Sequence, residues 1–173
     1  NPTDVSQLRQ LSNASDIIYL SQKLRLICLL TTHQALYQTD MNDAWEKDLM
    51  AMAEREEFSD VSAVKVYLVC YRMLREPEEA QHFQQFKNML IGQSAEFSDE
   101  EMHGLFILAV NYCVRGINAG QEKYSREVLD LYKTGLEKGY LFENGTLRRF
   151  SYYNIVAAGL QSGELDWVRF FIH

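Results

Sequence analysis

Apolar residues recur at spacings of three and four positions along nearly the whole chain, and this periodicity restricts its fold most strongly. The strict alternation that is typical of a half-buried strand is almost absent. Side chains three and four positions apart share one face of an α-helix, so the pattern predicts amphipathic helices throughout. Of the 173 residues, 47% are hydrophobic, which is enough to form a sizeable core. The sequence therefore predicts an all-α protein.

Residues that start and stop helices divide this pattern into segments. We expect helices at roughly 15–38, 43–57, 60–75, 77–91, 99–119, 121–138, 150–162 and 164–173, with a long loop around 140–147. Ser98 and Glu101 fit a capping box, and Pro77 suits the first turn of a helix. Glycines follow four periodic runs, where left-handed caps are expected: Gly92, Gly120, Gly139 and Gly163.

The predicted helices alternate between segments that are apolar on most sides and segments with a narrower apolar stripe. An inner helix, a short turn and an outer helix, repeated about four times, describe an α-α superhelix, a right-handed solenoid of antiparallel pairs. No linker-like composition interrupts residues 1–173, so we expect a single helical-repeat domain. The chain begins at Asn1 and its amphipathic pattern runs to His173, so we expect a fragment with further repeats or domains beyond that residue.

Two segments resemble the tetratricopeptide and pentatricopeptide superfamily of helical repeats. In the last helix pair, the family-like positions are Tyr153, Asn154, Gly159, Leu160, Gly163, Asp166 and Phe171. In segment 99–119, the positions spaced as in a tetratricopeptide inner helix are Leu105, Leu108, Ala109 and Tyr112. The resemblance implies close packing of two helices at Gly159 and a curved scaffold that holds a peptide or protein partner in its groove.

Motifs that announce catalysis or metal binding are missing from the sequence. It contains no phosphate-binding glycine loop, no dinucleotide fingerprint, and no H-E-x-x-H, C-x-x-C or G-x-S-x-G motif. The four histidines lie far apart, without a second ligand-type residue at the spacing of a helical metal site: His33, His82, His103 and His173. We therefore expect no catalytic residue, no metal and no cofactor, with an enzyme that carries no recognisable motif as an alternative.

Cysteine usage and hydropathy indicate where such a chain resides. Cys28, Cys70 and Cys113 lie in separate apolar segments, so we expect small buried hydrophobic residues in a reducing compartment and not a disulfide framework. The most apolar run, residues 105–114, is too short for a membrane span. These features predict a cytoplasmic protein that does not enter a membrane.

The net charge of −7 argues against a sequence-independent grip on nucleic acid, which needs clustered Lys and Arg. Pentatricopeptide proteins read RNA bases with a polar side chain two positions after the Tyr of the Tyr-Asn pair. The equivalent residue here is Ile155, which cannot hydrogen-bond to a base. A protein or peptide partner is therefore the main expectation, and single-stranded RNA is the alternative.

Beyond the first turns, the charged residues of the predicted inner helices are all basic, with no Asp or Glu among them. They are Lys23, Arg25, Lys65, Arg72, Arg75 and Arg115. If inner helices line the concave face, the groove is basic and suits an acidic peptide or a carboxylate. Alternatively, basic residues simply favour the C-terminal turns of helices.

A polar stripe crosses the apolar segment 99–119 at positions i, i+4 and i+7: Asn111, Arg115 and Asn118. Its side chains either bond to a neighbouring helix or face the groove and await a ligand. Together with Lys65 and Arg72, these three are the candidate partner-binding residues. The predicted function is a non-catalytic scaffold that binds a protein or peptide through a concave groove, with an acidic peptide as the partner if that groove is basic.

Overall fold

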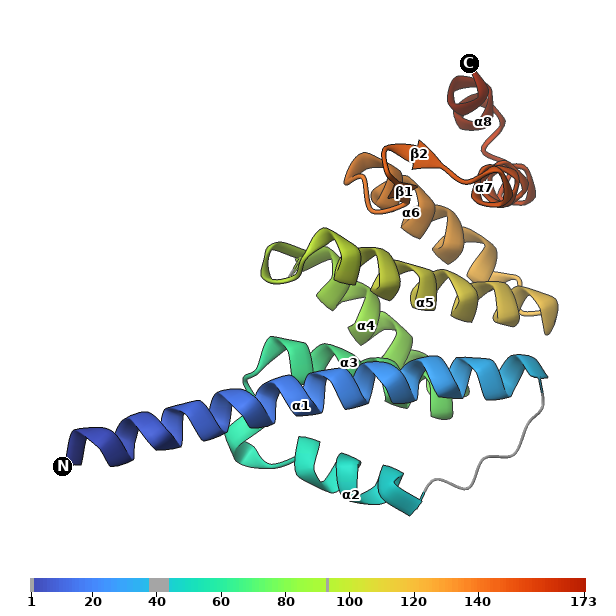
Figure 1. Ribbon diagram of the computed structural model, residues 1–173. Helices are drawn as coiled ribbons and strands as arrows, with labels where there is room; N and C mark the ends of the chain where they lie inside the picture. Colours follow the sequence, from blue (N-terminus) through green and yellow to red (C-terminus); the bar gives the residue numbers. More distant parts are fainter. Residues whose placement is uncertain (1, 38–43, 93) are drawn as a thin grey trace. The chain divides into compact units, whose positions relative to one another are not determined.

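The computed structural model describes residues 2–37, 44–92 and 94–173 (Figure 1). In these ranges the chain is almost entirely α-helical and contains one short hairpin, so the predicted all-α class is confirmed. The chain divides into two compact units, Asn1–Glu96 and Phe97–His173, and each unit has its own buried apolar core.

The first unit contains α1 (Pro2–Tyr37), α2 (Ala44–Ala53), α3 (Ser62–Arg75) and α4 (Ala80–Gly92). Two short 3-10 helices, η1 (Glu56–Phe58) and η2 (Ser94–Glu96), follow α2 and α4. Helices α1, α2 and α3 pack on one another, and α4 packs on α3. The fully buried side chains include Leu20, Leu24, Val66, Met73, Phe83 and Phe86. Helix α3 is therefore the centre of this unit, as its apolar sequence predicts.

The second unit contains α5 (Asp99–Asn118), α6 (Lys123–Glu137), α7 (Arg149–Gln161) and α8 (Leu165–Ile172). Strands β1 (Phe142–Glu143) and β2 (Thr146–Leu147) form an antiparallel hairpin between α6 and α7. Helix α6 packs on both α5 and α7, and α8 packs on α7. The core side chains include Met102, Phe106, Leu108, Leu129, Leu131 and Ile155.

Local signals in the sequence account for the ends of α5 and α7. The Ser98 hydroxyl accepts the backbone N–H of Glu101 at 3.3 Å, and the Ser98 N–H donates to the Glu101 carboxylate at 3.1 Å, so the capping box is confirmed. Gly120 and Gly163 follow these two helices with φ of 81° and 73°, the left-handed conformation that glycine adopts readily. Gly92 instead closes α4 in helical backbone, so the left-handed cap predicted there is wrong.

Helix α1 begins at Pro2, whereas we predicted a start near residue 15. Proline is favoured at the start of a helix, and no helix-breaking residue follows it before Ile18. Val5, Leu8 and Leu11 continue the helical spacing towards Ile18, and the prediction missed this extension. The predicted helix ends at 38 and 43 lie outside the described residues.

Pro77 lies in the turn between α3 and α4, ahead of the first residue of α4 at Ala80, so its predicted place in the first helical turn is wrong. The residue before a proline is excluded from helical backbone by steric contact, and Glu76 has φ −121° and ψ 62°. The second predicted helix, 43–57, likewise stops at Ala53 and is followed by the separate turn η1.

The region around Tyr140, predicted as a long loop, contains the hairpin β1–β2. Phe142 pairs with Leu147 and Glu143 with Thr146, so Asn144 and Gly145 form a two-residue turn. Their φ values of 51° and 75° are both positive, which is the geometry that an Asn-Gly pair favours in a tight hairpin. The hairpin shortens the connection from α6 to α7.

The three cysteines lie in the interior of the protein. Cys28, Cys70 and Cys113 are fully buried, as predicted for small apolar residues. Burial raises the pKa of the Cys70 thiol well above its usual value. Within the described residues, no helix combines the length and the apolar character needed to cross a bilayer.

Candidate functional site

A groove of about 310 Å³ lies within the second unit, with α5 and α7 as its sides and α6 contributing to its floor. Helix α7 faces the groove through residues at positions i, i+4, i+7 and i+11: Phe150, Asn154, Ala157 and Gln161. Helix α6 contributes Val128 and Tyr132, one turn apart. The small side chain of Ala157 opposite bulkier residues leaves the space between the helices open.

The side of α5 that faces the groove carries Val110, Val114 and Ile117 alongside Asn111 and Asn118. The spacing of i, i+4 and i+7 places these residues on one face of the helix. Two members of the predicted polar stripe, Asn111 and Asn118, therefore line the groove. Arg115, the third member, is half-buried in the last turn of α5 and does not line it.

Four carboxamides surround this apolar groove: Asn111, Asn118, Asn154 and Gln161. Asn154 is half-buried and the other three are exposed. None of the four side chains hydrogen-bonds to another residue in the part of the chain that the structure describes. Each carboxamide offers two donor hydrogens and an acceptor oxygen, so the rim holds unpaired donors and acceptors above an apolar floor.

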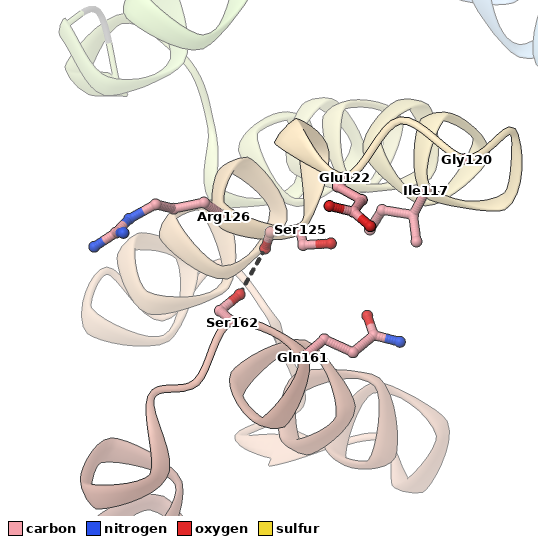
Figure 2. Close-up of a pocket in the computed structure, with 7 residues that line it drawn as sticks. All are labelled: Ile117, Gly120, Glu122, Ser125, Arg126, Gln161 and Ser162. Atoms are coloured by element: carbon pink, nitrogen blue, oxygen red, sulfur yellow. Dashed lines mark hydrogen bonds between the residues drawn. The ribbon is translucent and has the colours of Figure 1, made fainter.

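The groove itself is electrically neutral, because none of the described residues that line it is charged. A second hollow of about 600 Å³ adjoins it, and Ile117 and Gln161 line both. Figure 2 shows Gln161 facing Ile117 and Glu122 across this hollow, while Arg126 extends away from them. The Ser162 hydroxyl donates to the Ser125 carbonyl at 3.1 Å and ties the end of α7 to α6 (Figure 2).

Buried tyrosines of the second unit lie in two different places, one at the groove and the others in the core. Tyr132 is 4% exposed and contributes to the groove floor, and burial raises its pKa to about 12. Tyr112 packs edge-on against Tyr124 with ring centroids 5.4 Å apart and hydroxyl oxygens 3.1 Å apart. Burial, followed by this hydrogen bond, raises the pKa of Tyr112 above its usual value. Tyr112 belongs to the core and does not line the groove.

The predicted basic residues of α3 lie in the first unit, where carboxylates from the α2 region pair with them. Arg72 donates to Glu54 at 2.6 Å, and Arg75 donates to Glu46 at 2.8 Å. Tyr71 also donates to Glu46. Lys65 is exposed on α3, two turns before Arg72. Since Arg115 belongs to the other unit, a basic strip shared by Lys65, Arg72 and Arg115 stays a prediction.

Histidines and acidic residues do not assemble into a metal site. Among the described residues, no group of three or more His, Cys, Asp or Glu side chains is placed to hold an ion. The His103 ring donates from Nδ1 to the Tyr140 carbonyl at 2.7 Å, and Nε2 lies 3.4 Å from Glu143. His82 donates from Nε2 to Glu76 at 2.8 Å. These two histidines therefore have partners within the protein.

Asn154 and Gln161 complete the rim of the groove, and sequence reasoning did not select them. Asn154 was noted only as part of the Tyr-Asn pair, although its i, i+7 relation to Gln161 was visible in the sequence. Comparison with known proteins finds no matching family model, no similar curated protein and no similar solved structure, so the function must be inferred from this groove.

Proposed function

We propose that the second unit binds an extended peptide segment of a partner protein in the groove between α5 and α7, and that the protein is a non-catalytic helical scaffold. The observation that carries this proposal is the set of four carboxamides without partners around an apolar floor. A peptide backbone presents alternating N–H and C=O groups, and a carboxamide can both accept from the first and donate to the second.

The size and polarity of the groove support a small segment of chain as its ligand. A volume of about 310 Å³ is at the lower end of the range for ligand pockets, which begins at roughly 300 Å³. That space accommodates one or two apolar side chains over Val110, Val114 and Val128. Because the lining is uncharged, binding should depend only weakly on salt, in contrast to the acidic-peptide groove considered first.

Helix pairs stacked as an α-α superhelix would form a scaffold that can bind a peptide, and we propose that arrangement for the chain. Consecutive helices pack as α1–α2, α3–α4, α5–α6 and α7–α8, which are the four predicted pairs. The single-stranded RNA alternative has less support, because Ile155 is fully buried and no Lys or Arg lines the groove.

A displayed library of random peptides tests the proposal directly. We expect enrichment of a motif with one or two apolar residues, and binding of the corresponding synthetic peptide measured by fluorescence polarisation. Replacing both Asn111 and Asn154 with alanine should weaken that binding about tenfold, because each removes a hydrogen bond worth about 0.5–1.5 kcal/mol. Ala157→Phe should block binding by filling the groove from an exposed helix position.

Asn88→Ala is the matched control, since Asn88 is an exposed asparagine on α4 in the other unit. This control should bind the peptide as the parent protein does. A library that yields no enriched peptide, or a peptide whose affinity is unchanged by Ala157→Phe and by the double asparagine variant, would contradict the proposed function.

A further inference from the structure

Helix α1 carries apolar residues on two opposite faces. One face packs against α3 and includes the buried residues Leu20, Leu24 and Ile27. The other face is exposed and includes, in its N-terminal part, the apolar residues Val5, Leu8, Leu11, Ile18 and Tyr19, which we call the α1 stripe and which Asp4, Ser12 and Ser15 interrupt. At about 100° per residue, these five side chains lie within an arc of roughly 140° on the side opposite Leu20 and Leu24.

The five side chains of the α1 stripe are more exposed to solvent than is usual for large apolar residues. Val5 is 67% exposed, Leu8 and Leu11 are each 65% exposed, and Ile18 and Tyr19 are 58% and 51% exposed. Residues 4–15 are exposed around the whole helix, and the N-terminal half of α1 runs past the other helices of the first unit in Figure 1. An isolated segment of about 12 residues would be only marginally helical in water, so burial of the α1 stripe would stabilise this exposed part of the helix.

We propose that the α1 stripe pairs antiparallel with the same stripe of a second copy of this chain. The charges beside the stripe suggest this occupant and this orientation. Arg9 and Asp16 are seven residues apart and lie along the same edge of the stripe. Neither has a charged partner among the described residues.

In an antiparallel two-fold pair, each edge of the stripe meets itself in reverse order. Arg9 of one copy then lies opposite Asp16 of the other, and the pair occurs twice. In the same register, Leu8 comes to lie near Ile18, and Val5 near Tyr19, of the second copy. The opposite edge of the stripe carries Gln7 and Ala14, which are uncharged. In a parallel pair, Arg9 and Asp16 would face that uncharged edge of the second copy, so no ion pairs would form.

The area of the α1 stripe is sufficient for a weak, specific dimer. At the observed exposures, covering the five side chains on both copies buries on the order of 1,000 Å², which reaches the lower limit of about 1,000–1,200 Å² for specific interfaces. We therefore expect a dimer that dissociates on dilution in the micromolar range. This inference concerns the first unit and is independent of the peptide groove in the second.

Sedimentation velocity over about a hundredfold range of protein concentration tests the dimer. The sedimentation coefficient should rise with concentration, and Leu11→Glu should raise the dissociation constant at least tenfold. Gln10→Glu is the control, because it adds the same charge at the neighbouring exposed position outside the stripe. It should dimerise as the parent protein does, with circular dichroism verifying that both variants remain helical.

A charge exchange tests the orientation. Arg9→Asp alone and Asp16→Arg alone should each weaken the dimer, because each places like charges opposite one another. The double variant with both changes should restore the parent dissociation constant. A monomer at every concentration, a dimer unaffected by Leu11→Glu, or a double variant no better than the single ones would overturn the proposal.

Discussion

Tyr132 contributes to the floor of the groove, and folding buries its hydroxyl away from water. The side chain is 4% exposed, and burial raises its pKa from 10.0 to about 12. Among the described residues, this hydroxyl makes no hydrogen bond, so the contacts of Tyr132 are mostly those of its aromatic ring. A phenol that stays protonated in the folded state but ionises in the unfolded state links the stability of the protein to alkaline pH.

The free energy of unfolding should therefore fall between about pH 10 and pH 12. Below pH 10 Tyr132 is protonated in both states and its contribution is constant. As the pH rises, the unfolded chain loses the proton first, which costs up to about 1.4 kcal/mol of stability per pH unit. Urea titrations at several pH values should show a shallower decline for Tyr132→Phe. Tyr153→Phe serves as control, because Tyr153 is 54% exposed, and an identical decline for both variants would contradict this role.

Single residues explain why the candidate site was only partly predictable. Asn111 and Asn118 could be selected because a polar stripe on an otherwise apolar segment is a local signal. Asn154 and Gln161 could not, because their importance depends on α7 lying opposite α5 across the groove. The ion pair of Arg72 with Glu54 could not be predicted for a related reason, because the two residues are distant in sequence and meet only once α2 packs on α3.

At the scale of elements, helices were predictable where one face is apolar and the ends carry caps. Helix α5 has both, and its predicted range of 99–119 differs from Asp99–Asn118 by one residue. The start of α1 was missed because its N-terminal apolar residues are exposed and lie on the side opposite the buried face of the helix, so they do not continue the core stripe. The hairpin was missed, although the Asn144-Gly145 pair favours a tight turn, because each of its strands is only two residues long.

The spacing between α7 and α8 depends on a glycine. A Cβ atom at Gly159 would collide with a Val168 methyl group and lie 3.3 Å from the Trp167 ring. The two helices therefore approach more closely than any larger residue allows, which confirms the close packing expected at this position. Trp167 in turn stacks on Phe171, with ring centroids 5.4 Å apart, while Phe170 stays 82% exposed. The aromatic side chains of α8 are thus only partly exposed.

Gly159→Ala should lower the free energy of unfolding by about 1–3 kcal/mol, the usual cost of forcing a methyl group into a packed contact. Gly104→Ala is the matched comparison, because Gly104 is also helical and no atom lies within 4 Å of its would-be Cβ. There alanine should stabilise the protein by about 0.5–1 kcal/mol through helix propensity. Equal effects at the two positions in urea unfolding would show that α8 is not held against α7 at Gly159.

For the molecule as a whole, helical periodicity predicted the fold class but not the division into two units. Periodicity reports which side of each helix is apolar, and it does not reveal which helices share a core. Met73 and Phe83 are buried in the first unit, and Leu108 and Leu129 in the second. No linker composition marks the boundary near Glu96, because the connection there is short and contains the helical turn η2.

The two units should unfold in separate transitions, and the chain contains a natural probe of each. Its two tryptophans are Trp45 on α2 and Trp167 on α8, one in each unit. Trp45→Phe and Trp167→Phe variants thus report the fluorescence of one unit at a time. Met73→Ala and Leu108→Ala each delete a large buried side chain, which typically costs about 2–5 kcal/mol.

Met73→Ala should shift the urea midpoint reported by Trp45 and leave the Trp167 transition in place, and Leu108→Ala should do the reverse. The expectation follows from the separate cores, since a cavity destabilises the cooperative unit that contains it. If either substitution moved both transitions equally, the chain would unfold as one cooperative body, in agreement with the single helical-repeat domain predicted from the sequence. A Leu108→Ala loss below about half a kcal/mol would in addition show that α5 is not central to its unit.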